Sequence, residues 1–440
     1  MFTKTRISVS QVPQAQKNSD VVSGTFTRRF LKSFMATVGL AALCIGCAQN
    51  NKPAAGPTAD RSAAFWPPYP DEPRIQFLAS YQTSQDVQPP KGKFEELVYG
   101  KEPEQTLTLT KPYGVRMWNG RIYVCDIRNN SVTALDLKKH QVFVLGKTLT
   151  DVLQTPTDIA IAEDGVKYVT DTGRGTVAVY DAQDRRVSTF ARKDMKPVAA
   201  AVYKDELYVC DYENKNVVVF NRRTGDVKRT IGAAGGELGQ FVRPLAVAVD
   251  KQGFVYVMDI MKCQLQKFDQ QGKLVSAFGT NTARAGGFVR PKHIAVDSTG
   301  TIYVVDAAFQ NVQLFDQMGH VLTFFGSAGA HPGAMYLPVG ICIDEQDVDL
   351  FKDKIHPAFQ AERLVLVTNQ FGPNKVSVYA MGHLREGKTV RDIAASKGLV
   401  PTGTDDTKGP AVPTTLPGEV TTLPSEAAGP TTTRTTEAAK

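Results

Sequence analysis

The sequence has little of the material from which metal, haem and disulfide sites are built. Its 440 residues include only 6 cysteines and 6 histidines. It contains no C-x-x-C-H haem motif, no H-E-x-x-H zinc motif and no G-x-S-x-G nucleophile motif. These absences exclude c-type cytochromes, zincin proteases and hydrolases of the G-x-S-x-G type. We expect no cofactor.

Long hydrophobic runs are also missing, and the one apolar run near the N-terminus is short. Residues 27–49 read TRRFLKSFMATVGLAALCIGCAQ, a basic stretch followed by an apolar core of about a dozen residues. A run this short predicts a signal peptide rather than a membrane span. Gly46-Cys47 resembles the cleavage site of bacterial lipoproteins, which implies that Cys47 becomes the lipid-modified first residue. Cleavage without lipid and an uncleaved anchor remain open, as does the export route.

The excess of positive charge comes mostly from this leader. The chain carries a formal net charge of +7, but six basic residues and one acidic residue lie within residues 1–46. The mature chain therefore holds only about +2, and its charge gives no indication of nucleic-acid binding. We expect a cell-envelope location, lipid-anchored at the outer membrane and facing the periplasm or the exterior.

What the sequence does contain is one segment repeated five times, with a sixth, altered copy. The clearest copies are GQFVRPLAVAVDKQGFVYVMD and GGFVRPKHIAVDSTGTIYVVD. The repeat prolines are spaced by 44, 41, 47, 47 and 47 residues; they are Pro112, Pro156, Pro197, Pro244, Pro291 and Pro338. A period of about 40 to 50 residues is typical of propellers and solenoids.

Within each copy, apolar residues alternate in short runs separated by Gly, Asp and Asn. Such runs predict β-hairpins, and a fourth run such as HVLTFFG completes the four-stranded blade of a β-propeller. The pattern G-x-F-x-x-P-x-x-[IV]-A-[VL]-D-x-x-G-x-[IV]-Y-V-x-D resembles the NHL repeat of bacterial and other proteins. That resemblance implies an all-β, six-bladed propeller and covers roughly residues 74–380.

The sixth copy lacks its fourth strand. About twenty residues replace the tight turn before LVLVTN, and no strand-like run follows KVSVYA. The segment RIQFLASY, residues 74–81, is the one strand-like run left unassigned. We expect it to pair with blade six from the N-terminal side and so close the ring, which removes exposed sheet edges.

The ends differ in composition from the repeats. Residues 47–63 are small, polar and proline-containing, as expected of a tether. Residues 397–440 are rich in Thr, Pro, Gly and Ala and predict a disordered tail. The resulting organisation is a signal peptide (1–46), a tether (47–63), the propeller (64–396) and the tail.

Two residues at the channel are candidates for a site. The position two residues after each repeat proline holds Gly114, Asp158, Ala199, Ala246, His293 and Gly340. By resemblance, related propeller lyases hold zinc with histidines at such positions, but one histidine cannot supply three protein ligands. Asp158 of blade two and His293 of blade five should face each other across the channel. The pair could hold a metal weakly or bridge a water, or His293 could be an ordinary satisfied side chain.

Charged residues recur at two further repeat positions. The second strand of each regular blade ends in an aspartate, for which we expect a structural role as an acceptor of backbone N–H groups. The residue before the proline is a cation in four blades, and Lys292 adds a fifth charge. We name Lys111, Lys196, Arg243, Arg290 and Lys292 the rim cations; they are either solvated surface, partners of the aspartates, or a docking site for an anionic partner.

These observations favour a non-catalytic binding or scaffolding module whose partner is another exported or membrane protein or an anionic ligand. A hydrolase or lyase with its site at the channel mouth is an alternative. An accessory subunit of an exported redox assembly is another, by analogy of fold alone.

Replacing Cys47 tests the lipid anchor. Cys47→Ala should release soluble protein or leave an unprocessed precursor, because the acylated cysteine is the group that enters the membrane. Mass spectrometry of the wild-type N-terminus is the measurement. An unmodified mature N-terminus in the wild-type protein would contradict the prediction.

Overall fold

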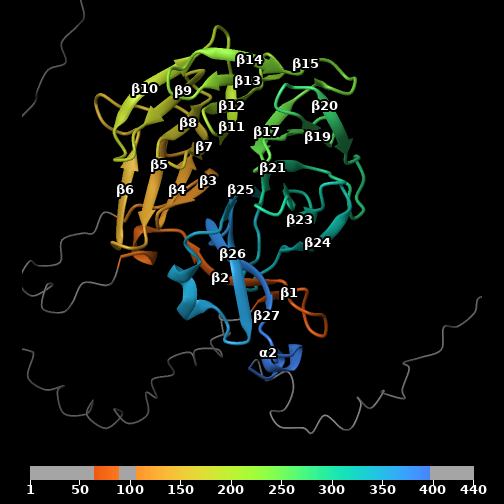
Figure 1. Ribbon diagram of the computed structural model, residues 1–440. Helices are drawn as coiled ribbons and strands as arrows, with labels where there is room; N and C mark the ends of the chain where they lie inside the picture. Colours follow the sequence, from red (N-terminus) through yellow and green to blue (C-terminus); the bar gives the residue numbers. More distant parts are fainter. Residues whose placement is uncertain (1–63, 89–105, 397–440) are drawn as a thin grey trace, which may run out of the picture. The chain divides into compact units, whose positions relative to one another are not determined.

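The computed structural model describes residues 64–88 and 106–396. The predicted signal peptide, the tether with Cys47, and the C-terminal tail lie outside the described residues. Within the described part, six antiparallel sheets radiate from a common centre (Figure 1). The six-bladed, all-β propeller predicted from the repeat is confirmed.

Each blade begins with an inner strand that starts at a repeat proline. Proline fits there because a strand's first residue can lack a backbone donor. The inner strands are β3 (Pro112–Trp118), β7 (Pro156–Ile161), β11 (Pro197–Tyr203), β17 (Pro244–Val249), β21 (Pro291–Val296) and β25 (Pro338–Asp344). Consecutive inner strands are neighbours, and β25 lies against β3, so the ring is closed.

Blades one to five continue as simple antiparallel meanders. The second strands are β4 (Arg121–Asp126), β8 (Lys167–Asp171), β12 (Glu206–Asp211), β18 (Val255–Asp259) and β22 (Ile302–Asp306). The third strands are β5 (Ser131–Asp136), β9 (Thr176–Tyr180), β13 (Asn216–Asn221), β19 (Gln264–Phe268) and β23 (Asn311–Phe315). The outer strands are β6 (Gln141–Leu145), β10 (Arg186–Ala191), β14 (Val227–Ile231), β20 (Leu274–Phe278) and β24 (Val321–Phe325).

Burial explains why the sequence alternates in some strands and not in others. The second strands are almost wholly buried, since both of their faces pack against neighbouring blades. The outer strands keep an exposed face and alternate instead. A short parallel pair, β15 (Ala233–Ala234) and β16 (Gln240–Phe241), tightens the loop into blade four.

Blade six is completed from the N-terminal side, as predicted. Its order is β1-β2-β27-β26-β25, in which β2 (Ile75–Tyr81) pairs antiparallel with β27 (Val376–Leu384). Two features were not predicted: β1 (Phe65–Trp66) adds a fifth strand, and β26 (Phe359–Asn369) starts within the insertion. A 3-10 helix, Val348–Lys354, and a short helix, α2 (Val390–Ser396), also lie outside the repeat pattern.

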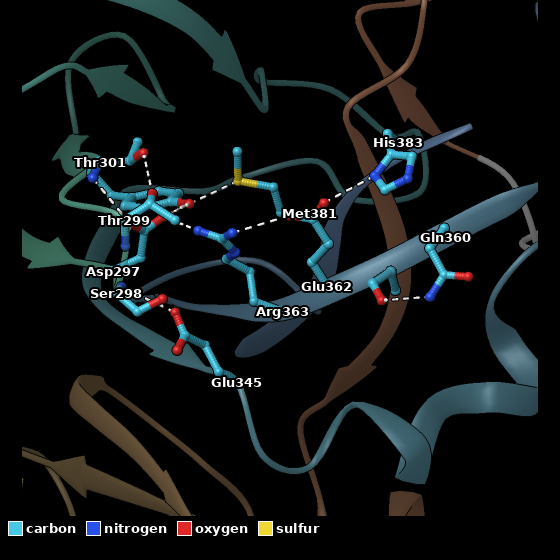
Figure 2. Close-up of polar contacts among 12 residues, drawn as sticks. Asp297, Ser298, Thr299, Thr301, Glu345, Gln360, Glu362, Arg363, Met381 and His383 are labelled. Atoms are coloured by element: carbon cyan, nitrogen blue, oxygen red, sulfur yellow. Dashed lines mark hydrogen bonds and ion pairs between the residues drawn. The ribbon is translucent and has the colours of Figure 1, made fainter. Parts of the chain in front are cut away.

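A buried polar network joins blades five and six (Figure 2). The Arg363 guanidinium of β26 forms an ion pair with Asp297, at the end of β21. Asp297 also accepts a hydrogen bond of 2.9 Å from the Tyr303 hydroxyl. Nearby, the Ser298 N–H donates to Glu345 at 3.0 Å. The last blade is thus held to its neighbour by charge as well as by packing.

The aspartates that end the second strands organise one face of the propeller, as expected from the repeat. The Asp126 carboxylate accepts backbone N–H bonds from Thr110 and Lys111 before the proline, at 2.6 and 3.1 Å. It also accepts from Arg128 and Asn129 in the following turn, each at 3.0 Å. The same arrangement recurs at Asp171, Asp211, Asp259 and Asp306. In blade six Asn369 replaces the aspartate and accepts from the Tyr336 N–H at 3.0 Å.

We call this side the proline face. It comprises the loops that enter each blade and the turns between second and third strands, because strand register places each proline opposite the strand-ending aspartate. The loops are 106–111, 146–155, 192–196, 232–243, 279–290 and 326–337, and the turns are 127–130, 172–175, 212–215, 260–263, 307–310 and 370–375. The opposite side is called the distal face.

Removing the closing strand tests the importance of ring closure. Deletion of residues 74–81 should destabilise the whole propeller cooperatively, because two sheet edges would be left unpaired. Phe77→Ala is the milder change: the Phe77 ring is buried against Tyr379, with centroids 5.5 Å apart. We expect a loss of about 3 kcal/mol in the free energy of unfolding.

The control is Val187→Ala on the exposed side of β10, which should change that free energy by less than about 0.5 kcal/mol. Denaturant unfolding followed by two probes is the measurement. A truncated protein that melts like the full chain would show that β2 is dispensable.

Candidate functional site: the channel and the proline face

The central channel is lined by small residues of the inner strands. A cavity of about 170 Å³ touches all six inner strands. The position four residues after each proline contributes to its wall, and the residues there are Arg116, Ala160, Ala201, Ala248, Ala295 and Cys342. Arg116 is the charged member of this layer.

Asp158 and His293, the predicted channel pair, lie within direct contact. Nε2 of His293 is 3.3 Å from Oδ2 of Asp158, so no water or metal separates blades two and five at this point. Asp158 is 0% exposed and His293 is 1% exposed. The Ala200 N–H of blade three donates to the same Asp158 oxygen at 3.0 Å.

Arg116 completes the cluster from the layer below. Its Nη2 lies 3.9 Å from Oδ2 of Asp158, and its Nη1 donates to the carbonyls of Val115 and Ile341. Sequence reasoning missed this residue. The available signal was a single arginine at a position where four of the six blades have alanine.

The surroundings favour the ionised form of Asp158. Burial alone would raise the pKa of its carboxyl, but Arg116 and His293, with the Ala200 N–H, outweigh burial and lower that pKa. Both ring nitrogens of His293 face acceptors, since Nδ1 is 3.0 Å from the Ile294 carbonyl oxygen. Both contacts are hydrogen bonds only when the ring carries two protons.

The two oxygens of Asp158 have different environments. All the contacts above reach Oδ2, whereas Oδ1 is buried without a hydrogen-bond partner among the described residues. Gly114 leaves the space for it, because a Cβ at that position would lie 2.5 Å from Oδ1. The Asp158 carboxylate is therefore held by buried partners of other blades and is not exposed to a substrate in solvent.

Metal chemistry finds little support in this part of the chain. Among residues 64–88 and 106–396, no group of three or more His, Cys, Asp or Glu side chains is placed to hold a metal ion. The described cysteines, Cys125, Cys210, Cys263 and Cys342, are all buried free thiols. Burial raises the pKa of Cys342 to about 11, and that of Cys125 and Cys210 is raised for the same reason. Buried thiols of this kind are poor nucleophiles.

The rim cations lie on the proline face. Lys111, Lys196, Arg243 and Arg290 precede the repeat prolines, and the strand-ending aspartates bind their backbone N–H groups. The aspartates are thereby occupied by the main chain. Among the described residues no ion pair within 4 Å involves a rim-cation side chain, although Lys196 and Arg243 each lie about 5 Å from the Tyr212 ring.

Lys292 follows its repeat proline, whereas the other four rim cations precede theirs. It is partly buried, and burial together with the neighbouring Arg290 lowers the pKa of its amine, while Asp306 opposes that shift. Tyr113 lies in the same region of the rim, where burial and Asp158 raise the pKa of its phenol to about 12. The charge of Asp158 in the channel therefore affects the pKa of Tyr113 at the inner edge of the proline face.

The distal face has a different character, because many of its cations are paired with carboxylates. Examples are Arg121 with Asp184 at 2.9 Å, Arg222 with Asp164 at 2.8 Å, and Lys251 with Glu345 at 3.6 Å. Each of these pairs joins two different blades. On the loops and turns of the proline face, by contrast, exposed basic residues outnumber exposed acidic ones among the described residues.

Sequence reasoning also missed one match to a phosphate-binding pattern. Residues 382–389, GHLREGKT, fit G-x-x-x-x-G-K-[ST] between β27 and α2. The structure does not form such a loop. Gly382 is still paired within the sheet, and the Thr389 hydroxyl and N–H both donate to Asp392, the residue that caps α2.

No family model matches the sequence. The chain is similar in structure to a streptogramin B lyase, with 12% identity and a TM-score of 0.43 over 62% of this chain and 94% of that chain. It is also similar to virginiamycin B lyase from Staphylococcus aureus, with 10% identity, a TM-score of 0.43, and coverage of 64% and 86%.

A third similar structure is a protein of unknown function from Bacteroides thetaiotaomicron, with 18% identity, a TM-score of 0.48, and coverage of 62% and 70%. At identities and TM-scores this low, the likeness does not extend to function. Among the described residues, no helix is both long enough and apolar enough to cross a membrane.

The channel pair generates a prediction about acid stability. Because the folded state lowers the pKa of Asp158, this carboxylate stabilises the protein above its unfolded pKa of about 4, and that contribution is lost as the pH falls through the lower, folded value. Asp158→Asn should reduce the free energy of unfolding by about 3 kcal/mol at pH 7. The difference from wild type should shrink below about pH 4.

Urea unfolding between about pH 3 and pH 7 is the measurement. Asp349→Asn, at an exposed position of the 3-10 helix, is the matched control and should follow the wild-type curve. A pH-independent difference between Asp158→Asn and wild type would show that the ion pair across the channel is not the stabilising interaction.

Proposed function

We propose that the protein is an exported, lipid-anchored propeller of the NHL-repeat type that acts as a non-catalytic binding module. Its proline face binds an anionic partner in the cell envelope. The observation that carries this proposal is the asymmetry of charge between the two faces.

The difference in charge between the two faces does not follow from the net charge, because the mature chain is nearly neutral. On the distal face, several arginines and lysines form ion pairs with carboxylates of other blades. On the proline face, the buried aspartates are engaged by backbone N–H groups, and the side chains of Lys196, Arg243 and Arg290 are exposed. Cations repeated around a ring produce fields that add over the channel mouth.

Other cations strengthen the field on this face. Exposed basic residues of the same loops and turns include Arg128, Lys147, Arg174, Lys193 and Arg284. The acidic residues exposed there are fewer, and they include Asp194, Glu213 and Glu237. An anionic partner would be drawn to this side with an association rate that falls as salt rises.

The location in the envelope is supported by the residues before the propeller. The short apolar run and the Gly46-Cys47 junction fit a lipoprotein signal. A propeller held by its N-terminal end would be kept in the envelope, where other exported and membrane proteins are available as partners.

The channel gives less support to a catalytic role. His293 and Asp158 are buried from solvent and lie in direct contact with each other. A general acid or base must come within hydrogen-bond reach of a substrate. The cavity on the distal side presents Arg116 among apolar walls and no second titrating group suited to proton transfer.

The test replaces the four rim cations that precede the repeat prolines together. The quadruple change of Lys111, Lys196, Arg243 and Arg290 to Ser should weaken binding to a poly-L-glutamate surface at least tenfold at about 0.02 M salt, and less at about 0.3 M. The melting temperature should change little, because these side chains form no ion pairs within the described part of the chain.

The matched control removes the same charge from the distal face, at exposed lysines without ion pairs in the described residues: Lys139, Lys204, Lys273 and Lys352 to Ser. It should retain binding. Equal loss of binding in both variants would show that binding depends on the net charge of the protein and not on the position of the cations. Equal loss of stability and binding in the rim variant would make the rim cations internal partners.

A further inference from the structure

We propose that the anionic partner of the proline face is a phospholipid surface, which the face touches with exposed apolar side chains set between its cations. This inference rests on the proposed function and names its partner. It goes beyond charge, because it depends on where the large apolar side chains are exposed.

Large apolar side chains are exposed on many loops and turns of the proline face. Leu149 is fully exposed, Leu238 and Phe371 are each 61% exposed, and Met261 is 58% exposed. Others on this face are Leu107, Val152, Val242 and Val289. On the turns of the distal face, the corresponding residues among those described are Tyr69, Met318 and Leu350.

The apolar residues and the cations alternate along the chain. Val242 directly precedes Arg243, Val289 precedes Arg290, and Met261 precedes Lys262. Leu149 lies two residues after Lys147. This order suits a membrane interface, where apolar side chains enter the boundary between headgroups and acyl chains while lysine and arginine remain at the level of the phosphates.

The strand pattern brings these residues to one side of the molecule. Inner strands begin and second strands end on the proline face in every blade, so loops far apart in the sequence are presented together (Figure 1). A membrane is a surface that all the blades can meet at once. Each loop would contribute a weak contact with the membrane, and the free energies of these contacts would add to give stable binding.

An acidic protein partner fits these side chains less well. Protein interfaces concentrate their binding energy in a central cluster of buried aromatic anchors. Here the exposed apolar groups are mostly aliphatic, and they are spread over the loops of several blades. Tyr212, an aromatic residue beside the rim cations, already packs between Lys196 and Arg243.

The experiment uses the full chain carrying Cys47→Ala, so that an acyl group cannot hold it on the membrane. Co-sedimentation is measured with vesicles of phosphatidylcholine alone and with vesicles containing about 30% phosphatidylglycerol. We expect binding to the anionic vesicles and at least tenfold weaker binding to the neutral ones.

The decisive variant changes Leu149, Leu238, Met261 and Phe371 to Ser. It should weaken vesicle binding at least tenfold and leave both the melting temperature and poly-L-glutamate binding unchanged, because the cations remain. The control changes Val187, Met318, Leu322 and Phe324, which are exposed outside the proline face, to Ser. This control should bind vesicles like the wild type.

The outcomes separate this inference from the proposed function. Binding to poly-L-glutamate without binding to anionic vesicles would overturn the lipid surface and leave an acidic protein as the partner. Vesicle binding that survives the decisive variant would overturn apolar insertion, and with it the inference. Failure to bind either probe would overturn the proposed function as well.

Discussion

Buried carboxylates that bind backbone N–H groups hold the proline face together. Asp126 and its counterparts each join the loop that enters a blade to the turn that leaves its second strand. A buried carboxylate is tolerated only when donors replace its hydration, and the main chain supplies them here. The main chain satisfies the aspartates, and the cations that precede the repeat prolines form no side-chain ion pair among the described residues. One repeated interaction therefore sets the shape of this face.

On the distal face, the same residue types make a different kind of contact. There, side chains pair with side chains across blade boundaries, as Arg222 does with Asp164. In the channel, Asp158, His293 and Arg116 link blades two, five and one. Charged side chains thus join blades at the distal face and in the channel, whereas the rim cations of the proline face form no ion pair among the described residues.

Repeat periodicity made most of the fold predictable. Each of the six repeat prolines begins an inner strand, and placing Asp158 opposite His293 needs only the knowledge that blades two and five of six face each other. Blade six was less predictable, since Phe359 and Leu384 extend a hairpin through residues that follow no repeat.

The predicted site was incomplete for physical reasons as well. Arg116 belongs to the next layer of the channel and reaches Asp158 through the length of its side chain, which spacing in the sequence does not reveal. Likewise, composition cannot tell whether an aspartate binds a neighbouring lysine through its side chain or through its backbone. That choice depends on the direction of the turn.

Ring closure by β2 has a consequence for how the chain reaches its final state. Ile75 pairs with Met381, so strands roughly 300 residues apart in the sequence become neighbours. Contacts of this separation form late, because the chain between them must first be ordered. Strand β2 is synthesised before the repeats, but it can pair with β27 only after nearly the whole propeller has been made. Until then the edge of β27 is open to strands of other molecules. A chain that crosses a membrane before folding would complete this step only on the far side.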